Sequence, residues 1–168
     1  MKTLIAYFSR ADENYVSGAL KTLEKGNTEV VAEMIQKETG ADLFKINPVV
    51  QYAVGYNDCI AEAKEDQRRN ARPELTEYPD NISEYDTIYL GFPNYWGTMP
   101  MAVFTFLERY DFDGKVIKPF CTHEGSGMGR SESDIRRLCG TAMVEKGLAI
   151  HGSSVLKAAD AVKKFVQE

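Results

Sequence analysis

The chain has 168 residues, of which 43% are hydrophobic and 27% charged, and its formal net charge is −5. This length and composition fit one domain over residues 1–168, and the acidic balance argues against nucleic-acid binding, which needs a concentrated basic surface. The three cysteines form no CxxC pair and there are only two histidines, so no structural metal site is expected.

The beginning of the sequence resembles a strand rather than a targeting segment. It lacks the basic start and the small-residue cleavage site of a signal peptide. No apolar run approaches the roughly 20 residues that span a bilayer. We therefore expect a cytoplasmic protein without a membrane segment.

The first half of the chain alternates strand and helix patterns. Residues 2–8 form a nearly continuous apolar run, which is typical of a parallel strand covered on both faces. A helical stripe begins after Gly26 and stops at Gly40, and residues 41–46 form a weaker strand. A second helix is expected to end before Pro73. Its apolar positions are Tyr56, Cys59, Ile60 and Ala63.

Three more strands follow. Residues 87–92 form the third strand, and residues 115–121 form the fourth, which Pro119 should weaken or bend into a bulge. Residues 147–150 give a short last strand. All three are apolar runs bounded by turn residues, as expected for strands of one buried sheet.

Helices separate and follow these strands. Pro100 suits the first turn of one helix. Another is expected where apolar residues share one face, with Ser131 and Asp134 as a capping box at its start. That face carries Ile135, Leu138, Cys139, Ala142 and Met143. A closing helix is expected over residues 156–166.

The whole pattern is a strand followed by a helix, five times over. Such alternation implies an α/β domain with a parallel sheet and helices on both faces. Ligands of open α/β sheets bind beyond the carboxyl ends of the strands. Three loops at such positions carry residues suited to a flat, phosphorylated ligand.

The first of these loops has two parts. Ser9 and Arg10 follow the first strand, and Asn27 and Thr28 open a helix after an excursion over residues 11–25. Hydroxyls, an amide and unpaired helix N–H groups suit a phosphate dianion. The simpler interpretation is that Asn27 or Thr28 only caps the helix. Neither a Walker lysine nor a GxGxxG fingerprint is present.

The second loop follows the third strand and holds the single tryptophan, Trp96, beside Tyr95. An exposed aromatic pair costs stability unless it packs on something. A flat ligand ring would satisfy that need, and so would the protein's own core. The loop consists of Pro93, Asn94, Tyr95, Trp96 and Gly97.

The third loop is rich in glycine and follows the fourth strand. Gly125 and Gly127 permit close backbone approach to a ring, and Thr122 and Ser126 can hydrogen-bond its polar edge. A mobile surface loop is the simpler interpretation. His123 is a candidate for proton transfer, because the pKa of a free imidazole lies near neutrality, or else a solvated loop residue. No catalytic residue is assigned beyond it.

Together the loops resemble the flavodoxin-like family. The resemblance rests on residues 6–10 with 26–28, on residues 93–97 and on residues 122–127, and it spans nearly the whole chain. Residues 56–75 resemble a bacterial branch of the family. The family fold is a three-layer sandwich with a five-stranded parallel sheet in the order 2-1-3-4-5, and its cofactor, FMN, lies at the switch between strands one and three.

The resemblance also implies which residues would contact FMN. The phosphate contacts would be Ser9, Arg10, Asn27 and Thr28, and the ring contacts would be Pro93, Asn94, Tyr95, Trp96 and Gly97 on one side and Thr122, His123, Gly125, Ser126 and Gly127 on the other. The family's phosphate loop is usually compact, so residues 11–25 are an insertion here. We expect this insertion to cover the site or to bind a partner.

Two functional classes remain open. An electron carrier would shuttle single electrons between redox partner proteins, and the acidic balance favours basic partners. A flavin enzyme would take hydride from NAD(P)H and reduce a small-molecule acceptor such as a quinone, and it would usually form a homodimer that completes the pocket. A third class is an interaction module that binds no FMN. A receiver domain is excluded, because Pro93 and Asn94 follow the third strand where that fold needs an aspartate.

Overall fold

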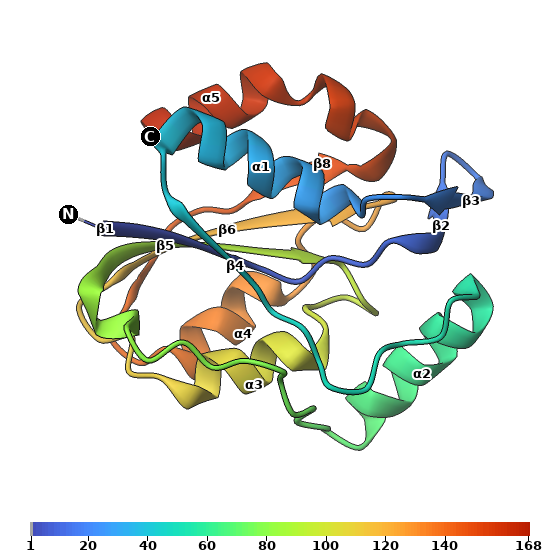
Figure 1. Cartoon of the computed structure of the whole chain (residues 1–168), viewed down its shortest axis with the longest axis horizontal. Coiled ribbons are helices and arrows are strands. Elements are labelled where there is room, and N and C mark those ends of the chain that lie inside the picture. Colours follow the sequence, from blue (N-terminus) through green and yellow to red (C-terminus); the bar gives the residue numbers. More distant parts are fainter. Residues whose placement is uncertain (1) are drawn as a thin grey trace.

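A computed structural model describes residues 2–168, in which a parallel sheet lies between two layers of helices (Figure 1). The strands, in spatial order, are β4 (Asp42–Lys45), β1 (Lys2–Tyr7), β5 (Tyr85–Pro93), β6 (Val116–His123) and, sharing the fifth place, β7 (Met143–Val144) and β8 (Leu148–His151). All of these strands pair in parallel. Counted along the chain this is the order 2-1-3-4-5, so the predicted fold is confirmed.

The two helical layers create two cores. Helices α1 (Asn27–Thr39) and α5 (Ala159–Gln167) cover one face, and α3 (Met101–Arg109) and α4 (Ser131–Leu138) cover the other, with α2 (Tyr56–Arg68) beside them (Figure 1). Successive side chains of a strand point to opposite faces. Leu4 and Ala6 of β1 accordingly belong to the core under α3 and α4, whereas Ile5 and Tyr7 belong to the core under α1 and α5.

Pro119 disturbs the strand beside it rather than its own. Strand β6 is unbroken against β5, where Pro119 pairs with Leu90, so the predicted bulge does not form. On the other side of β6, Ile117 O accepts the Glu145 N–H. Pro119 lies two residues further and faces the same side, where it has no N–H to donate. The fifth strand is interrupted there, between β7 and β8.

The helix predicted through Met143 is shorter than expected. Helix α4 ends at Leu138, Gly140 has a φ of 59°, and Met143 opens β7. The capping box is also wrong: Ser131 is already inside the helix, and its hydroxyl donates to Met128 O. The Asp134 carboxylate instead accepts the Thr98 hydroxyl at 2.6 Å.

The insertion forms a β-hairpin that was not expected from the sequence pattern. Strands β2 (Asp12–Val16) and β3 (Ala19–Leu23) are antiparallel. Ser17 and Gly18 between them have φ values of 52° and 81°. Positive φ at both central residues is the type I′ geometry that matches the twist of a hairpin. The hairpin lies at the end of the sheet where β1 ends, as does α2 (Figure 1).

The remaining helical segments are short. A 3₁₀ helix, η1 (Ile82–Glu84), precedes β5, and another, η2 (Gly152–Lys157), precedes α5, so the predicted closing helix is divided in two. Helix α3 begins at Met101, one residue after Pro100. Within residues 2–168 no helix combines the length and the apolar character needed to cross a membrane.

Candidate functional site

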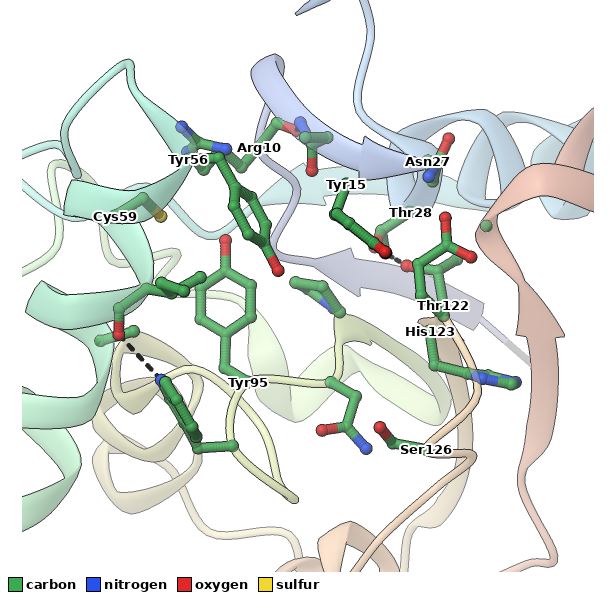
Figure 2. A pocket seen from close by; sticks show the side chains of 18 of the residues that line it. Arg10, Tyr15, Asn27, Thr28, Tyr56, Cys59, Tyr95, Thr122, His123 and Ser126 are labelled. Atoms are coloured by element: carbon green, nitrogen blue, oxygen red, sulfur yellow. Dashed lines mark hydrogen bonds between the residues drawn. The ribbon is translucent and has the colours of Figure 1, made fainter. Parts of the chain in front are cut away.

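A cavity of about 440 Å³ opens where the loops after β1, β5 and β6 meet (Figure 2). This volume falls within the range of roughly 300–1,000 Å³ that small-molecule sites occupy. All three predicted loops contribute to it. Eleven of the fourteen predicted site residues line the cavity: Arg10, Asn27, Thr28, Pro93, Asn94, Tyr95, Trp96, Gly97, Thr122, His123 and Ser126.

The other three predicted residues support the loops instead of lining the cavity. Ser9 Oγ accepts the Glu29 N–H at 3.0 Å and so satisfies a donor in the first turn of α1. The Gly125 N–H donates to His123 Nδ1 at 2.8 Å. Gly127 O accepts the side-chain amide of Asn94 at 2.9 Å, which ties the second loop to the third.

One end of the cavity offers hydrogen-bond donors. Thr28 and Thr122 are almost fully buried, and their hydroxyls lie 2.8 Å apart at the right of Figure 2. Helix α1 has no side-chain cap at Gly26, and among residues 2–168 the backbone N–H groups of Asn27 and Thr28 donate to no protein acceptor. Unpaired N–H groups at the start of a helix favour an anion.

The other end of the cavity is aromatic. The ring of Tyr95 packs edge-on against Phe8 and Tyr52, at centroid distances of 5.8 and 6.0 Å. Burial raises the pKa of the Tyr95 hydroxyl well above its ordinary value, and it also raises the pKa of the Cys59 thiol on the facing helix. Both groups therefore stay protonated at neutral pH. In Figure 2, Tyr95, Cys59 and Tyr56 lie opposite the end marked by Thr28 and Thr122.

The second loop turns sharply beside this aromatic end. The Tyr95 N–H donates to Thr98 O at 2.8 Å, and Trp96 between them has a φ of 55°. This left-handed conformation is costly for a bulky residue, so the surroundings must hold it. Asn94 Oδ1 accepts the Gly97 N–H at 2.9 Å, and the indole N–H of Trp96 donates to Ile60 O of α2 at 2.8 Å.

The hairpin closes one side of the cavity. Tyr15 of β2 lines it and packs on Tyr56 of α2, with ring centroids 5.9 Å apart. Glu13 Oε1 accepts the Tyr56 N–H at 2.8 Å. The Arg10 guanidinium donates to backbone oxygens of Glu13 and Ala53, and so holds the hairpin against the chain before α2. Its Nε–H is buried and has no acceptor among residues 2–168.

A polar cluster borders the donor end. Glu124 Oε1 accepts the Ser17 N–H of the hairpin at 3.2 Å, and Oε2 lies 2.9 Å from His151 Nδ1. The ring of His151 is 5.5 Å from that of His123. Partial burial and this neighbouring imidazole lower the pKa of His123, although Glu124 opposes the shift. Because His123 Nδ1 accepts the Gly125 N–H, the neutral ring carries its proton on Nε2.

Eight residues that line the cavity were not predicted as site residues. Four lie on the stripe of α2 that resembled an ordinary core-facing surface, and two lie in the insertion. The eight are Asn14, Tyr15, Tyr56, Cys59, Ile60, Ala63, Glu124 and Gly152. The tyrosine at the start of the α2 stripe was the available signal, because a tyrosine hydroxyl usually needs a polar partner when it is buried.

Sequence comparison decides the family. A sequence model of the family described as Flavodoxin matches residues 2–168. The chain belongs to the flavodoxin family. The predicted family is therefore confirmed over almost the full length of the chain. Among curated proteins no significant match exists.

Solved structures of other flavodoxin-like proteins share the fold. A candidate flavoprotein from Bacteroides uniformis is 27% identical, with a TM-score of 0.77, 99% of this chain covered and 98% of that one. Another from Bacteroides eggerthii is 24% identical, with a TM-score of 0.73 and coverages of 96% and 97%. A Lactobacillus acidophilus flavoprotein in complex with FMN is 21% identical, with a TM-score of 0.65 and coverages of 95% and 98%.

Proposed function

We propose that this flavodoxin-family chain binds FMN in the cavity and uses it to transfer electrons. The observation that carries the proposal is the division of one cavity into a donor end, where α1 begins, and an aromatic end around Tyr95. A phosphorylated flavin has the same division, an anion at one end and a flat ring at the other. The Lactobacillus flavoprotein of the same fold is a complex with FMN.

The donor end fits a phosphate. The free N–H groups of Asn27 and Thr28 supply backbone donors, and the side-chain amide of Asn27 adds a third. A Cβ on Gly152 would lie 2.7 Å from that amide and 3.4 Å from Glu124 Oε1, so the amide and this carboxylate flank the same point. The Glu124 carboxylate lines the cavity at this end, and its negative charge opposes an anion.

The aromatic end fits a flavin ring. Tyr95 is held in place by Phe8 and Tyr52, and Trp96 by Ile60, so neither ring must be ordered when a ligand arrives. Preorganised aromatic side chains lower the entropic cost of binding. The unpaired Nε–H of Arg10 is a further donor, buried at the wall of the cavity.

Bound FMN supplies one-electron and two-electron redox chemistry. The chain's own residues orient it and control access. Asn94 braces the second loop against the third, and Tyr15 of the hairpin excludes water from one side. His123, neutral above its lowered pKa, holds a proton on Nε2 at the border of the cavity, where it can pass between protein and ligand.

A carrier and an oxidoreductase differ in the molecules that give electrons to the flavin and take them from it. The test is a visible spectrum of the FMN-loaded protein during anaerobic reduction, first with NADPH and then with dithionite. We expect little reaction with NADPH and reduction by dithionite in two one-electron steps, as befits a carrier between redox partners. Rapid bleaching by NADPH in one step would instead identify an oxidoreductase for quinones or similar acceptors and refute the carrier assignment.

A further inference from the structure

Two cationic side chains lie beside the turn that Trp96 and Gly97 form. Trp96 is 44% exposed, and the Lys64 Nζ of α2 lies 4.7 Å from its ring centroid. At the next residue of the turn, the backbone N–H of Arg130 donates to Gly97 O at 2.8 Å. A Cβ on Gly97 would lie 3.2 Å from Arg130 Nη1, so the guanidinium covers the turn itself. Lys64 of α2 and Arg130, the residue before α4, thus both lie beside the Trp96–Gly97 turn.

Among the charged groups placed beside this turn and their ion-pair partners, cations are in excess. Asp134 is the acidic partner here, and it is shared: Arg130 Nε lies 3.6 Å and Arg137 Nη2 3.3 Å from its carboxylate. Two arginines on one carboxylate leave a charge of +1. Among residues 2–168, Lys64 has no carboxylate within 4.0 Å, and it adds another.

Further along α2 the charges cancel. Arg68 pairs with Glu65 at 2.5 Å, and Arg69 pairs with Asp66 at 3.0 Å. The carboxylate that borders the cavity, Glu124, belongs to its donor end, beside the hairpin. The surface beside Trp96 is therefore positive, although the net charge of the chain is −5.

We propose that the positive rim formed by Trp96, Lys64 and Arg130 is the docking site of a small anionic electron acceptor that carries phosphate or carboxylate groups. The inference rests on the proposed function, because it names the class of molecule that takes electrons there. At physiological salt, charges act over about 8 Å, so a small anion responds to the rim alone. An acidic protein would also meet the negative remainder of the chain, which disfavours it.

The fluorescence of Trp96 can report the charge of the rim. It is the single tryptophan of the chain, so its fluorescence in the FMN-free protein can be quenched with iodide, caesium or neutral acrylamide. A positive rim should favour iodide and disfavour caesium despite the net charge of −5, and removal of its charges should reverse both effects. In Lys64→Gln/Arg130→Gln the iodide quenching constant should fall by about twofold and the caesium constant should rise. Acrylamide quenching should stay the same, which shows that the exposure of the ring is unchanged.

The matched control is Lys163→Gln/Lys164→Gln, which removes the same two charges from exposed positions of α5, on the opposite face of the sheet. This variant should quench as the parent does. An iodide quenching constant that stays the same in Lys64→Gln/Arg130→Gln, or an equal effect of both double variants, would overturn the positive rim.

Competition then tests docking. Pyrophosphate and citrate, the phosphate and carboxylate probes, should protect Trp96 from iodide at millimolar concentrations in the parent chain but not in Lys64→Gln/Arg130→Gln. Protection by one alone identifies which group the partner carries, and protection by neither refutes the docking site. An FMN titration of the same sample tests the proposed function separately, because the quenching experiment needs no flavin.

Discussion

Thr28 and Thr122 join two loops of the cavity through one buried hydrogen bond of 2.8 Å. Thr28→Val leaves the Thr122 hydroxyl buried without this partner, so we expect the free energy of unfolding to fall by about 1–3 kcal/mol. Thr122→Val should cost a similar amount. The double variant should cost much less than the sum, because it removes both polar groups at nearly constant shape. Urea unfolding of the three variants measures this, and additive losses would show that the bond contributes nothing.

Glu124 sets the affinity for an anion at the donor end. Glu124→Gln keeps an oxygen for the Ser17 N–H but removes the negative charge beside Asn27. We expect FMN to bind roughly fivefold more tightly, equivalent to about 1 kcal/mol of relieved repulsion in a solvated site. Glu38→Gln, at the exposed far end of α1, removes the same charge and should have no effect. Titration of FMN fluorescence measures both, and weaker binding in Glu124→Gln would contradict the assignment of this end to the phosphate.

At the scale of single residues, the sequence predicted the loops better than the roles within them. The hydroxyls, amides and aromatic side chains of the three loops were visible in the sequence. Eleven of the fourteen predicted site residues line the cavity. Ser9 does not, because its hydroxyl serves the first turn of α1. A loop serine looks the same in the sequence whether its hydroxyl binds a ligand or a backbone N–H. Only the structure distinguishes these two roles.

Among the elements, the β2–β3 hairpin determines how closed the cavity is. Tyr15 and Leu20 pair across the two strands, but only Tyr15 lines the cavity and packs on Tyr56. We expect Tyr15→Ala to speed FMN dissociation roughly fivefold, from the loss of about 1 kcal/mol of aromatic packing. Leu20→Ala is the matched control and should leave the rate unchanged. Stopped-flow dissociation measures both rates, and equal rates in all three chains would show that the hairpin does not cover the ligand.

The differences between the expected and the observed elements have local causes. The Ser17–Gly18 turn is a recognisable hairpin signal, because both residues take positive φ, but its flanking strands carry few buried side chains and so show no apolar alternation. In α4 the apolar spacing continues past Gly140, although the helix itself ends at Leu138. A glycine in the left-handed region ended the helix where periodicity alone predicted more of it.

For the molecule as a whole, stability should depend on pH through His123. Burial and the His151 ring hold the pKa of His123 below its ordinary 6.5, and Glu124 opposes this. As the pH falls below that value, the unfolded chain binds protons that the folded chain resists, so the free energy of unfolding decreases. His123→Asn keeps an acceptor for the Gly125 N–H and cannot titrate. Its urea-unfolding free energy should fall less between roughly pH 7 and pH 5 than the parent's, and an identical decline would contradict this role.

The overall topology was predictable because alternating strand and helix patterns leave few ways to build a parallel sheet. The walls of the cavity were harder to predict. They bring α2, the hairpin and the loop after β6 together over long sequence separations, and Cys59 and Ala63 have the same spacing whether they face a core or a ligand.

The central claim is that this cavity binds FMN, and a fluorescence titration of FMN with the purified, flavin-free protein tests it most directly. We predict that the flavin emission is quenched to an endpoint at one FMN per chain, because aromatic side chains surround the ring in the single cavity that the three loops share. Emission that does not change on addition of a molar excess of folded protein would contradict the account.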